Sequence, residues 1–257
     1  MNPFTHPKSQ FFQTIGIFFV AILMGTTFIA CDDDEPQPKP PSHFNNKIMP
    51  LGASRVEGAR PDFESYRYEL WKLLIEGGWE FDFIGTQTDN SDYDDFQASS
   101  FDKDHEGRGG WTSGQILDGL EGWLESNGEI DIVLFSSPGG NDILNRLSPY
   151  DQTISNINEI IDILQAKNPN VTIIIERLAP GMSSIMTPEL TNDFNLMQEE
   201  VTKIANEQST SSSQVITVDM VTGFNDSLLA DDVHYNEAGA KFIADRYYEV
   251  LKGVLQQ

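Results

Sequence analysis

Four short segments of the chain carry side chains or backbone groups that together could hydrolyse an ester. Ser54 follows a Gly-Ala pair, Asn141 follows two glycines, and Asp231 and His234 stand three residues apart near the C-terminus. A serine hydroxyl becomes a nucleophile when an imidazole takes its proton, and a carboxylate holds that imidazole in the required tautomer. Backbone N–H groups, such as that of Gly110, and an asparagine amide can bind the oxyanion that forms. These residue types favour acyl transfer, although Ser54 could instead be an ordinary helix N-cap and His234 a structural histidine.

Patterns of apolar residues indicate which elements must hold these side chains. From Lys47 onward, short runs rich in β-branched residues alternate with longer stretches of helical periodicity. Two of the runs are almost continuously apolar, as expected for strands that helices cover on both faces. Five such strands with crossover helices predict one α/β domain on a five-stranded, parallel, doubly wound sheet. We expect strands at 48–51, 81–84, 130–135, 171–175 and 215–218, and helices at about 66–76, 112–126, 151–167, 187–208 and 236–255.

The candidate side chains all follow expected strands. In an open parallel sheet, ligands bind beyond the carboxyl ends of the strands. Residues 52–54 follow the first strand, residues 104–112 belong to a long loop after the second, and residues 138–142 follow the third. Residues 230–234 follow the fifth strand. We therefore expect one rim of the sheet to hold the serine, the glycines, the asparagine and the Asp-x-x-His pair.

These blocks resemble, in their order, the SGNH/GDSL hydrolases, and the resemblance covers essentially the whole chain from Lys47 on. The blocks are Gly52-Ala53-Ser54, Gly110, Gly139-Gly140-Asn141-Asp142 and Asp231-Asp232-Val233-His234. Residues 49–52, 66–71 and 105–112 look like one branch, carbohydrate esterase family three, the acetylxylan esterase group. The resemblance implies a three-layer α/β/α, flavodoxin-like fold.

The resemblance also implies a role for each residue. Ser54 would be the nucleophile, His234 its general base, and Asp231 the acceptor that holds the imidazole. The backbone N–H groups of Ser54 and Gly110 and the side-chain amide of Asn141 would form the oxyanion hole. No cofactor is expected, and one cysteine with four histidines offers no zinc site.

Two neighbouring side chains are candidates for substrate binding. Arg55 directly follows the serine, and Trp111 follows Gly110. Trp111 is either a core or rim aromatic or a platform for a sugar ring. The family motif has aspartate at the position of Ala53. Its absence could loosen Ser54, slow the enzyme or mark an inactive relative.

The predicted function is removal of acetyl groups from a polysaccharide or oligosaccharide by a serine esterase. One alternative is an esterase or lipase for another small acyl ester, and the other is a catalytically impaired, glycan-binding lipoprotein, for which Ala53 is the best support. The formal net charge of −24, from 16 basic and 40 acidic residues, argues against a nucleic-acid partner. We expect a monomer.

The first 31 residues resemble the signal of a bacterial lipoprotein. Lys8 precedes an apolar stretch that ends in Ala30-Cys31, and an acidic run follows, as in Bacteroidetes lipoproteins. We predict a signal peptide at 1–30, lipidation of Cys31, an acidic and Pro-rich linker at 31–46, and the hydrolase domain at 47–257. This predicts attachment to the outer membrane, on its periplasmic side or at the cell surface. An uncleaved N-terminal membrane anchor is the alternative.

Other polar residues have expected roles outside the reaction. We expect His105 to brace its loop, Asp142 to order its own turn, and Asp232 to be solvated. Four aspartates between residues 89 and 95 could form either a calcium site or a solvated acidic loop. They lack the glycine and the final glutamate of an EF-hand loop, which favours the solvated loop.

Overall fold

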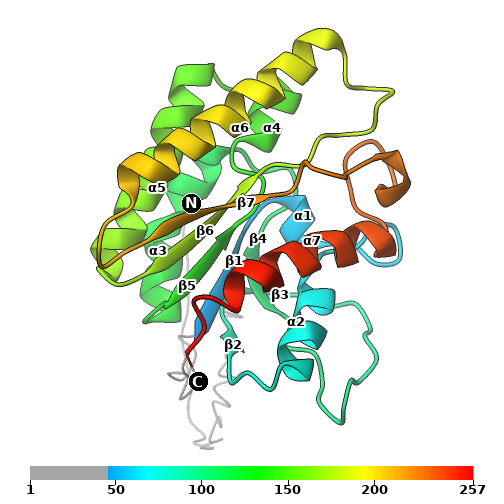
Figure 1. Ribbon diagram of the computed structural model, residues 1–257, viewed down its shortest axis with the longest axis vertical. Helices are drawn as coiled ribbons and strands as arrows, with labels where there is room; N and C mark the ends of the chain where they lie inside the picture. The colour runs from blue at the N-terminus through cyan, green and yellow to red at the C-terminus, as the bar shows by residue number, and fades with distance from the viewer. Residues whose placement is uncertain (1–45, 257) are drawn as a thin grey trace, which may run out of the picture. The chain divides into compact units, whose positions relative to one another are not determined.

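The computed structural model describes residues 46–256, which form a central sheet with helices on both faces (Figure 1). The predicted signal peptide, Cys31 and nearly all of the predicted linker lie outside these residues, so they and the domain boundary at Lys47 stay predictions. No helix of the described chain is long and apolar enough to cross a bilayer. The strands are β1 Lys47–Gly52, β2 Asp82–Phe83, β3 Gln87–Thr88, β4 Asp104–Gly107, β5 Ile132–Phe135, β6 Thr172–Arg177 and β7 Val215–Asp219.

The sheet is mostly parallel, which confirms the predicted fold class. Its strands lie in the order β3-β4-β1-β5-β6-β7, with β2 paired to the start of β1. The strands β4, β1, β5, β6 and β7 all run parallel, and only β3 is antiparallel to its neighbour. Taken alone, the five parallel strands follow the flavodoxin-like order 2-1-3-4-5. The switch point lies between β1 and β5, where the chain first crosses to the other side of β1.

The second position in the sheet is taken by a segment that the sequence did not predict as a strand. The expected strand at 81–84 is reduced to the two residues of β2, and β4 pairs with β1 instead, with Leu51 opposite Glu106. The described sheet has seven strands in all, because the two-residue strands β2 and β3 extend the five parallel ones. The sequence of β4 is polar, but His105 and Glu106 are buried, and Glu106 accepts hydrogen bonds from Thr86 and Arg108. These partners remove the cost of burying polar groups.

Helices cover both faces of the sheet. α3, α5 and α6 pack on one face, and α2 and α7 pack on the other (Figure 1). The five long helices match the predicted ones within a few residues, while the short helices α1 and α4 were not predicted. The helices are α1 Ser54–Glu57, α2 Arg67–Glu76, α3 Ser113–Asn127, α4 Gly140–Leu144, α5 Tyr150–Lys167, α6 Pro188–Gln208 and α7 Glu237–Leu251.

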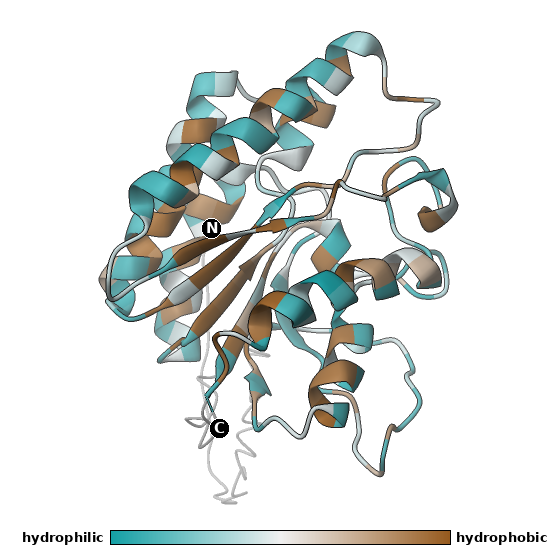
Figure 2. Ribbon diagram, viewed as in Figure 1, coloured by the Kyte–Doolittle hydropathy of each residue, from teal (hydrophilic) through white to brown (hydrophobic). Residues whose placement is uncertain are grey.

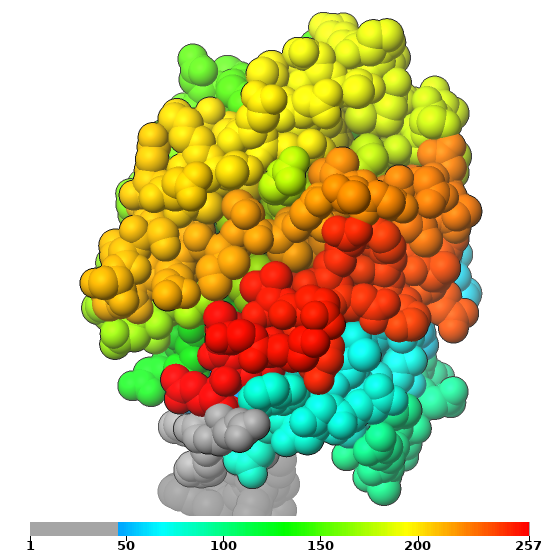
Figure 3. Space-filling model, in the orientation of Figure 1, coloured from blue at the N-terminus to red at the C-terminus, as the bar shows by residue number. Residues whose placement is uncertain are grey.

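Alternate residues of the strands build two separate cores. Met49 and Leu51 of β1 face the core under α3, α5 and α6, and Ile48 faces the core under α2 and α7. The central strands β5 and β6 are accordingly coloured mostly as hydrophobic in Figure 2. Figure 3 shows the segment from β7 to the start of α7 lying between α6 and α7 on one face. The segment thus begins at a strand of the sheet and ends at a helix whose inner face is buried.

The acidic loop between β3 and β4 is tied to the body of the domain by a buried ion pair. Arg67 is fully buried, and its guanidinium contacts the Asp89 carboxylate at 3.1 Å. The Tyr93 hydroxyl also donates to Asp89. Burial opposes ionisation of Asp89, but hydrogen bonds from Tyr93 and Ser91 outweigh it and lower the pKa of the carboxyl. Asp89 is therefore not solvated, in contrast to the other three aspartates of this loop, which are exposed.

Candidate active site

The turn from β1 into α1 places Ser54 at the carboxyl edge of the sheet. β1 ends at Gly52, and Ser54 is the first residue of α1. A Cβ atom at Gly52 would lie 2.8 Å from a methyl group of Val56 and 2.9 Å from the carbonyl oxygen of Ser136. Only glycine therefore lets the end of β1 approach the chain after β5 so closely. The serine comes to lie at the switch point between β1 and β5, where open α/β sheets bind their ligands.

Ser54, His234 and Asp231 form one hydrogen-bonded series. The Oγ atom of Ser54 lies 2.9 Å from Nε2 of His234. The other ring nitrogen, Nδ1, lies 2.7 Å from Oδ2 of Asp231. A carboxylate can only accept, so Nδ1 carries the proton and Nε2 is left as the acceptor for the serine hydroxyl. The structure thus brings together three side chains that are up to 180 residues apart in sequence.

The same carboxylate also fixes the loop that carries the histidine. Oδ1 of Asp231 accepts the backbone N–H groups of Val233 at 2.9 Å and His234 at 2.8 Å. Burial acts to raise the pKa of Asp231, but these hydrogen bonds and the histidine ring outweigh burial and lower it. Asp231 is therefore ionised at neutral pH, as the acceptor of the imidazole N–H must be. Its neighbour Asp232 is exposed, as expected.

An aromatic ring holds the imidazole from one side. Phe63 stacks on His234 with ring centroids 3.8 Å apart and an angle of 15° between the planes. Such a face-to-face contact restricts rotation of the imidazole about its side-chain bonds. Nothing in the local sequence marked Phe63, because the segment before α2 lies about 170 residues from the histidine loop.

Arg55 joins the turn at Ser54 to two other loops. Its side chain is only 8% exposed, and Nε donates to the carbonyl oxygen of Val233 at 2.9 Å. Nη1 donates to Ala179 at 2.8 Å and Nη2 donates to Pro180 at 3.1 Å. Through these three hydrogen bonds Arg55 braces the loop between Asp231 and His234 against α1. A role of Arg55 in substrate binding stays a prediction.

A buried glutamate supports the loop after β5. Glu176 of β6 is fully buried and accepts the backbone N–H of Ser137 at 2.7 Å and the Ser136 hydroxyl at 3.0 Å. Burial raises the pKa of Glu176, although the nearby Arg55 and several hydrogen bonds act in the opposite direction. No pattern in the sequence marks Glu176, because a single glutamate at the end of an apolar run looks like the end of a strand.

Of the candidate oxyanion donors, the side chain of Asn141 lines the same cavity as Ser54. Asn141 lies in α4, and its Nδ2 atom donates to the carbonyl oxygen of Trp111 at 2.8 Å. An amide nitrogen carries two hydrogens, so the second remains for an oxyanion. The backbone N–H of Arg108 donates to the carbonyl of Gly52 at 3.1 Å. This hydrogen bond holds the loop after β4, which contains Gly109 and Gly110, against the end of β1. Gly110 follows in this loop with φ of +77°, a left-handed conformation that favours glycine.

Asp142, His105 and Trp111, the remaining residues singled out in the sequence, lie in the segments around Ser54 and Asn141. Asp142 is buried and accepts the N–H and the hydroxyl of Ser113, both at 2.8 Å, so it joins α4 to the start of α3 rather than ordering its own turn. His105 is also buried, and its Nδ1 accepts the Gly107 N–H at 2.9 Å, so it braces its segment as expected. Trp111 is partly buried against the core beside Trp123. This is the position of a rim aromatic, and a role in sugar binding stays a prediction.

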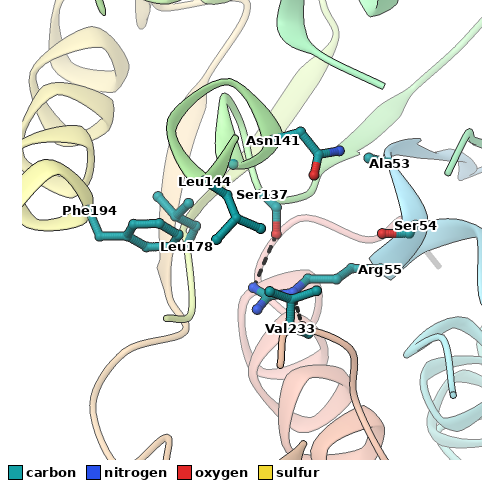
Figure 4. A pocket seen from close by; sticks show the side chains of 10 residues that line it. Ala53, Ser54, Arg55, Ser137, Asn141, Leu144, Leu178, Phe194 and Val233 are labelled. Atoms are coloured by element: carbon teal, nitrogen blue, oxygen red, sulfur yellow. Dashed lines mark hydrogen bonds between the residues drawn. The ribbon is translucent and has the colours of Figure 1, made fainter. Parts of the chain in front are cut away.

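A small cavity opens directly beside the Ser54 hydroxyl. Its volume is about 40 Å³. Figure 4 shows the Ser54 hydroxyl directed toward it, with Asn141 above and three apolar side chains on the opposite side. The lining residues are Ala53, Ser54, Arg55, Ser137, Gly140, Asn141, Leu144, Leu178, Phe194 and Val233. The described residues contain no group of three histidine, cysteine or acidic side chains placed to hold a metal ion.

Known structures share this arrangement of elements. A carbohydrate esterase of family 3 from Talaromyces cellulolyticus is 26% identical, with a TM-score of 0.68 over 81% of this chain and 97% of that one. A family 3 carbohydrate esterase of Clostridium thermocellum is 29% identical, with a TM-score of 0.66 over 82% of this chain and 100% of that one. An acetyl esterase mutant with an acetate ion is 27% identical, with a TM-score of 0.66 over 81% and 97%. A search of curated proteins found no match.

The sequence also matches a family model over most of its length. The model of the GDSL-like lipase/acylhydrolase family matches residues 76–242, which include Gly110, Asn141, Asp231 and His234. The match begins after Ser54, so Ser54 itself lies outside it. The family match and the esterase structures together support hydrolysis of carboxylic esters. The chain therefore belongs to the GDSL-like lipase/acylhydrolase family and is a carboxylic ester hydrolase.

Proposed function

We propose that this hydrolase removes acetyl groups from a polysaccharide or oligosaccharide, with Ser54 as its nucleophile. The observation that carries the proposal is the hydrogen-bonded series from Ser54 to His234, at 2.9 Å, and from His234 to Asp231, at 2.7 Å. These are the contacts that transfer a proton from a serine hydroxyl to an imidazole. The contacts are already within hydrogen-bond reach without substrate.

The first half of the reaction forms an acetyl-serine. As Oγ of Ser54 attacks the ester carbonyl carbon, its proton passes to Nε2 of His234. The ionised Asp231 stabilises the imidazolium that results. When the tetrahedral intermediate collapses, its bond to the sugar oxygen breaks and Nε2 returns the proton to that oxygen. The sugar leaves with a free hydroxyl group.

The second half of the reaction releases acetate. A water molecule gives a proton to Nε2 of His234 while its oxygen attacks the acetyl carbon. The intermediate then collapses, the bond to Oγ breaks, and Ser54 regains its proton from the imidazole. Because the same three groups serve both halves, no metal or cofactor enters this mechanism.

Three donors would stabilise the negative oxygen in both intermediates. They are the backbone N–H groups of Ser54 and Gly110 and the free hydrogen of the Asn141 amide. The hydrogen bond from Asn141 to the Trp111 carbonyl holds that amide in place before substrate binds. A preorganised donor of this kind stabilises a transition state by about 3–4 kcal/mol.

The choice of acetylated carbohydrate as substrate rests on two observations. The similar structures include two family 3 carbohydrate esterases and an acetyl esterase, at 26–29% identity. The cavity beside Ser54, at about 40 Å³, also suits a small acyl group. We further propose that Cys31 carries a lipid anchor, which would hold the enzyme in the cell envelope near polymeric substrates.

The test is release of acetate by the full chain from acetylated xylan and from 4-nitrophenyl acetate. A Ser54→Ala variant serves as the control, and its rate should fall by at least about 10⁴-fold, since the nucleophile is lost. The ratio of the two substrates measures preference for sugar. If the folded wild type releases no acetate from either substrate, the proposal is wrong.

The alanine at position 53 favours one competing function, the binding of glycans without hydrolysis. A site without the aspartate of the family motif could bind acetylated glycans without hydrolysing them. Binding of acetylated xylan with no acetate release, together with activity gained in an Ala53→Asp variant, would support that alternative.

A further inference from the structure

We propose that Glu176 is a positioning residue for the reaction. Its buried carboxylate holds Ser137 in a left-handed backbone conformation, and the turn formed in this way presents the Asn141 amide to the oxyanion. The inference rests on the proposed function, in which Asn141 is an oxyanion donor. Glu176 is fully buried in β6 and does not line the cavity beside Ser54, so it would act only through the turn.

The turn after β5 determines where Asn141 lies. β5 ends at Phe135 and α4 begins at Gly140, so a short segment reverses the chain between them. The carbonyl oxygen of Ser137 accepts the N–H of Gly140 at 2.9 Å, which closes the turn. Asn141 is the second residue of α4, and its side chain lines the same cavity as Ser54. A rotation of the backbone at Ser137 would therefore move the amide of Asn141.

Ser137 adopts a conformation that its local sequence disfavours. Its φ is +48°, in the left-handed region, where the side chain of an L-residue crowds the backbone. Pro138 follows, and a residue before proline favours an extended backbone with φ of about −120°. Non-glycine residues keep such a conformation only where the surrounding structure holds them in it. A contact from outside the turn must therefore hold Ser137.

The carboxylate of Glu176 supplies that contact. Oε2 accepts both donors of Ser137, the backbone N–H at 2.7 Å and the hydroxyl at 3.2 Å. Holding the N–H and the hydroxyl on a single oxygen restricts rotation about the N–Cα bond, which is the rotation that φ measures. The other oxygen, Oε1, accepts the hydroxyl of Ser136 at 3.0 Å. All three hydrogen bonds come from the two residues at the start of the turn.

Stability alone gives little reason for a carboxylate at this position. Residues 173–175 of the same strand are fully buried isoleucines, and Glu176 is buried to the same degree. Burying a carboxylate is costly, and burial accordingly raises the pKa of Glu176. Even a paired buried charge contributes little net stability compared with well-packed apolar side chains. The carboxylate instead specifies one conformation of the turn, which an apolar side chain has no means of doing.

The test has to separate this role from that of Arg55, which lies beside the same carboxylate. Nη1 of Arg55 lies 3.5 Å from the hydroxyl of Ser137 (Figure 4), and the guanidinium lowers the pKa of Glu176. A change at Glu176 could therefore act through Arg55 on the histidine loop. Only the route through Ser137 depends on the residue type at position 137. Glycine adopts a left-handed φ without a steric penalty, so Ser137→Gly should remove the need for the carboxylate.

The experiment measures kcat and KM for 4-nitrophenyl acetate in variants of the full chain. Glu176→Met removes both accepting oxygens and keeps a similar length, whereas Glu176→Gln keeps one neutral acceptor. Each is made alone and together with Ser137→Gly. Ser136→Ala is the matched control, because it removes the hydrogen bond to Oε1 and leaves both donors of Ser137 in place. Circular dichroism and urea unfolding check that each variant is folded.

We expect kcat to fall about 100-fold in Glu176→Met, the loss typical of a displaced oxyanion donor. It should fall about 10-fold in Glu176→Gln, because a neutral acceptor forms the weaker hydrogen bond. KM should stay within about threefold of the wild type, since the donor acts on the transition state. If Glu176→Met does not fold, the Glu176→Gln variants decide.

The double variants and the control show whether Ser137 carries the effect. Relative to Ser137→Gly alone, the same two substitutions at Glu176 should lower kcat by no more than about threefold, because the coupled contact is already absent. Ser136→Ala should keep kcat within about threefold of the wild type, since the turn before Asn141 keeps its geometry.

Two results would overturn the inference. A folded variant of Glu176 with the kcat of the wild type would show that the carboxylate contributes only to stability. An equal loss of kcat with and without Ser137→Gly would show that Glu176 acts by another route, such as Arg55. In both cases the wild type hydrolyses the ester and Ser54→Ala does not, so the proposed function stands. Absence of hydrolysis by the folded wild type would instead overturn the proposed function.

Discussion

Replacing Arg55 by methionine tests whether the active site depends on the brace between its loops. The change keeps an unbranched chain of similar length and removes the guanidinium, which donates to Val233, Ala179 and Pro180 at 2.8–3.1 Å. Methionine also removes the cation that lowers the pKa of the buried Glu176 carboxyl, so this carboxyl becomes easier to protonate. The main consequences come from three carbonyl oxygens that lose their donor.

The expected loss of stability follows from the burial of these carbonyls. Ala179 is buried, and its oxygen loses a charge-assisted hydrogen bond of about 2–3 kcal/mol. Val233 and Pro180 are half-buried, so water can replace part of the donor, and each loss is about 0.5–1 kcal/mol. We expect the free energy of unfolding to fall by about 3–5 kcal/mol in Arg55→Met.

The expected loss of activity follows from the position of Val233 between Asp231 and His234. Without the arginine, the histidine loop can shift away from Ser54, and a displacement of about 1 Å costs on the order of 100-fold in rate. We expect kcat for 4-nitrophenyl acetate to fall about 10- to 100-fold, with a KM within about threefold of the wild type. Arg55→Lys should be intermediate, because one ammonium cannot reach all three carbonyls.

Urea unfolding and steady-state kinetics measure the two effects separately. Arg246→Met is a matched control, since Arg246 on α7 also donates to backbone carbonyls, that of Asp219 at the end of β7 and that of Thr222 after it. It should lose stability and keep its kcat. If Arg55→Met loses stability but retains wild-type kcat, the positioning argument is wrong. If it loses neither, the hydrogen bonds themselves contribute nothing measurable.

Three further predictions concern neighbouring parts of the domain. Phe63→Ala should lower kcat about 10-fold with little change in KM, because the imidazole of His234 loses its stacking partner, and steady-state kinetics measures this. Asp89→Asn should lower the free energy of unfolding in urea by about 3–5 kcal/mol, because it leaves the buried charge of Arg67 unpaired; an unchanged midpoint would refute this. Burial raises the pKa of Asp102 to about 7. In the unfolded chain this carboxyl titrates near 4. The folded protein therefore holds the extra proton between these values, and stability should fall as pH rises from about 4 to 7. Asp102→Asn should flatten this part of the curve of stability against pH.

The position of the site at one edge of the sheet could be predicted from the sequence, because the direction of the strands decides where their carboxyl ends lie. Once the runs at 130–135 and 171–175 are read as buried parallel strands, residues that follow such strands must gather at one edge. The structure brings Ser54, Asp231 and His234 together there, within hydrogen-bond distance of one another. Their catalytic roles stay a proposal, which the Ser54→Ala control tests.

Segments that form by long-range pairing were not predictable in this way. β4 has a polar sequence of four residues and is a strand because β1 and β3 flank it. The pair of Asp89 with Arg67 and the contacts of Glu176 are equally invisible locally, since each joins residues far apart in the chain. A pattern in the sequence reports which face of an element is apolar, but not which partner a polar residue meets.

The sequence by itself determined the α/β class, the five long helices and the set of residues that could perform acyl transfer, because these depend on periodicity and on residue chemistry. The tertiary structure alone decided that Arg55 is a brace, that Phe63 holds His234, and that the cavity beside Ser54 is small and apolar. The physical reason is that burial and hydrogen-bond partners are fixed only when elements pack, so the same arginine after a serine could face solvent in one fold and three carbonyls in another.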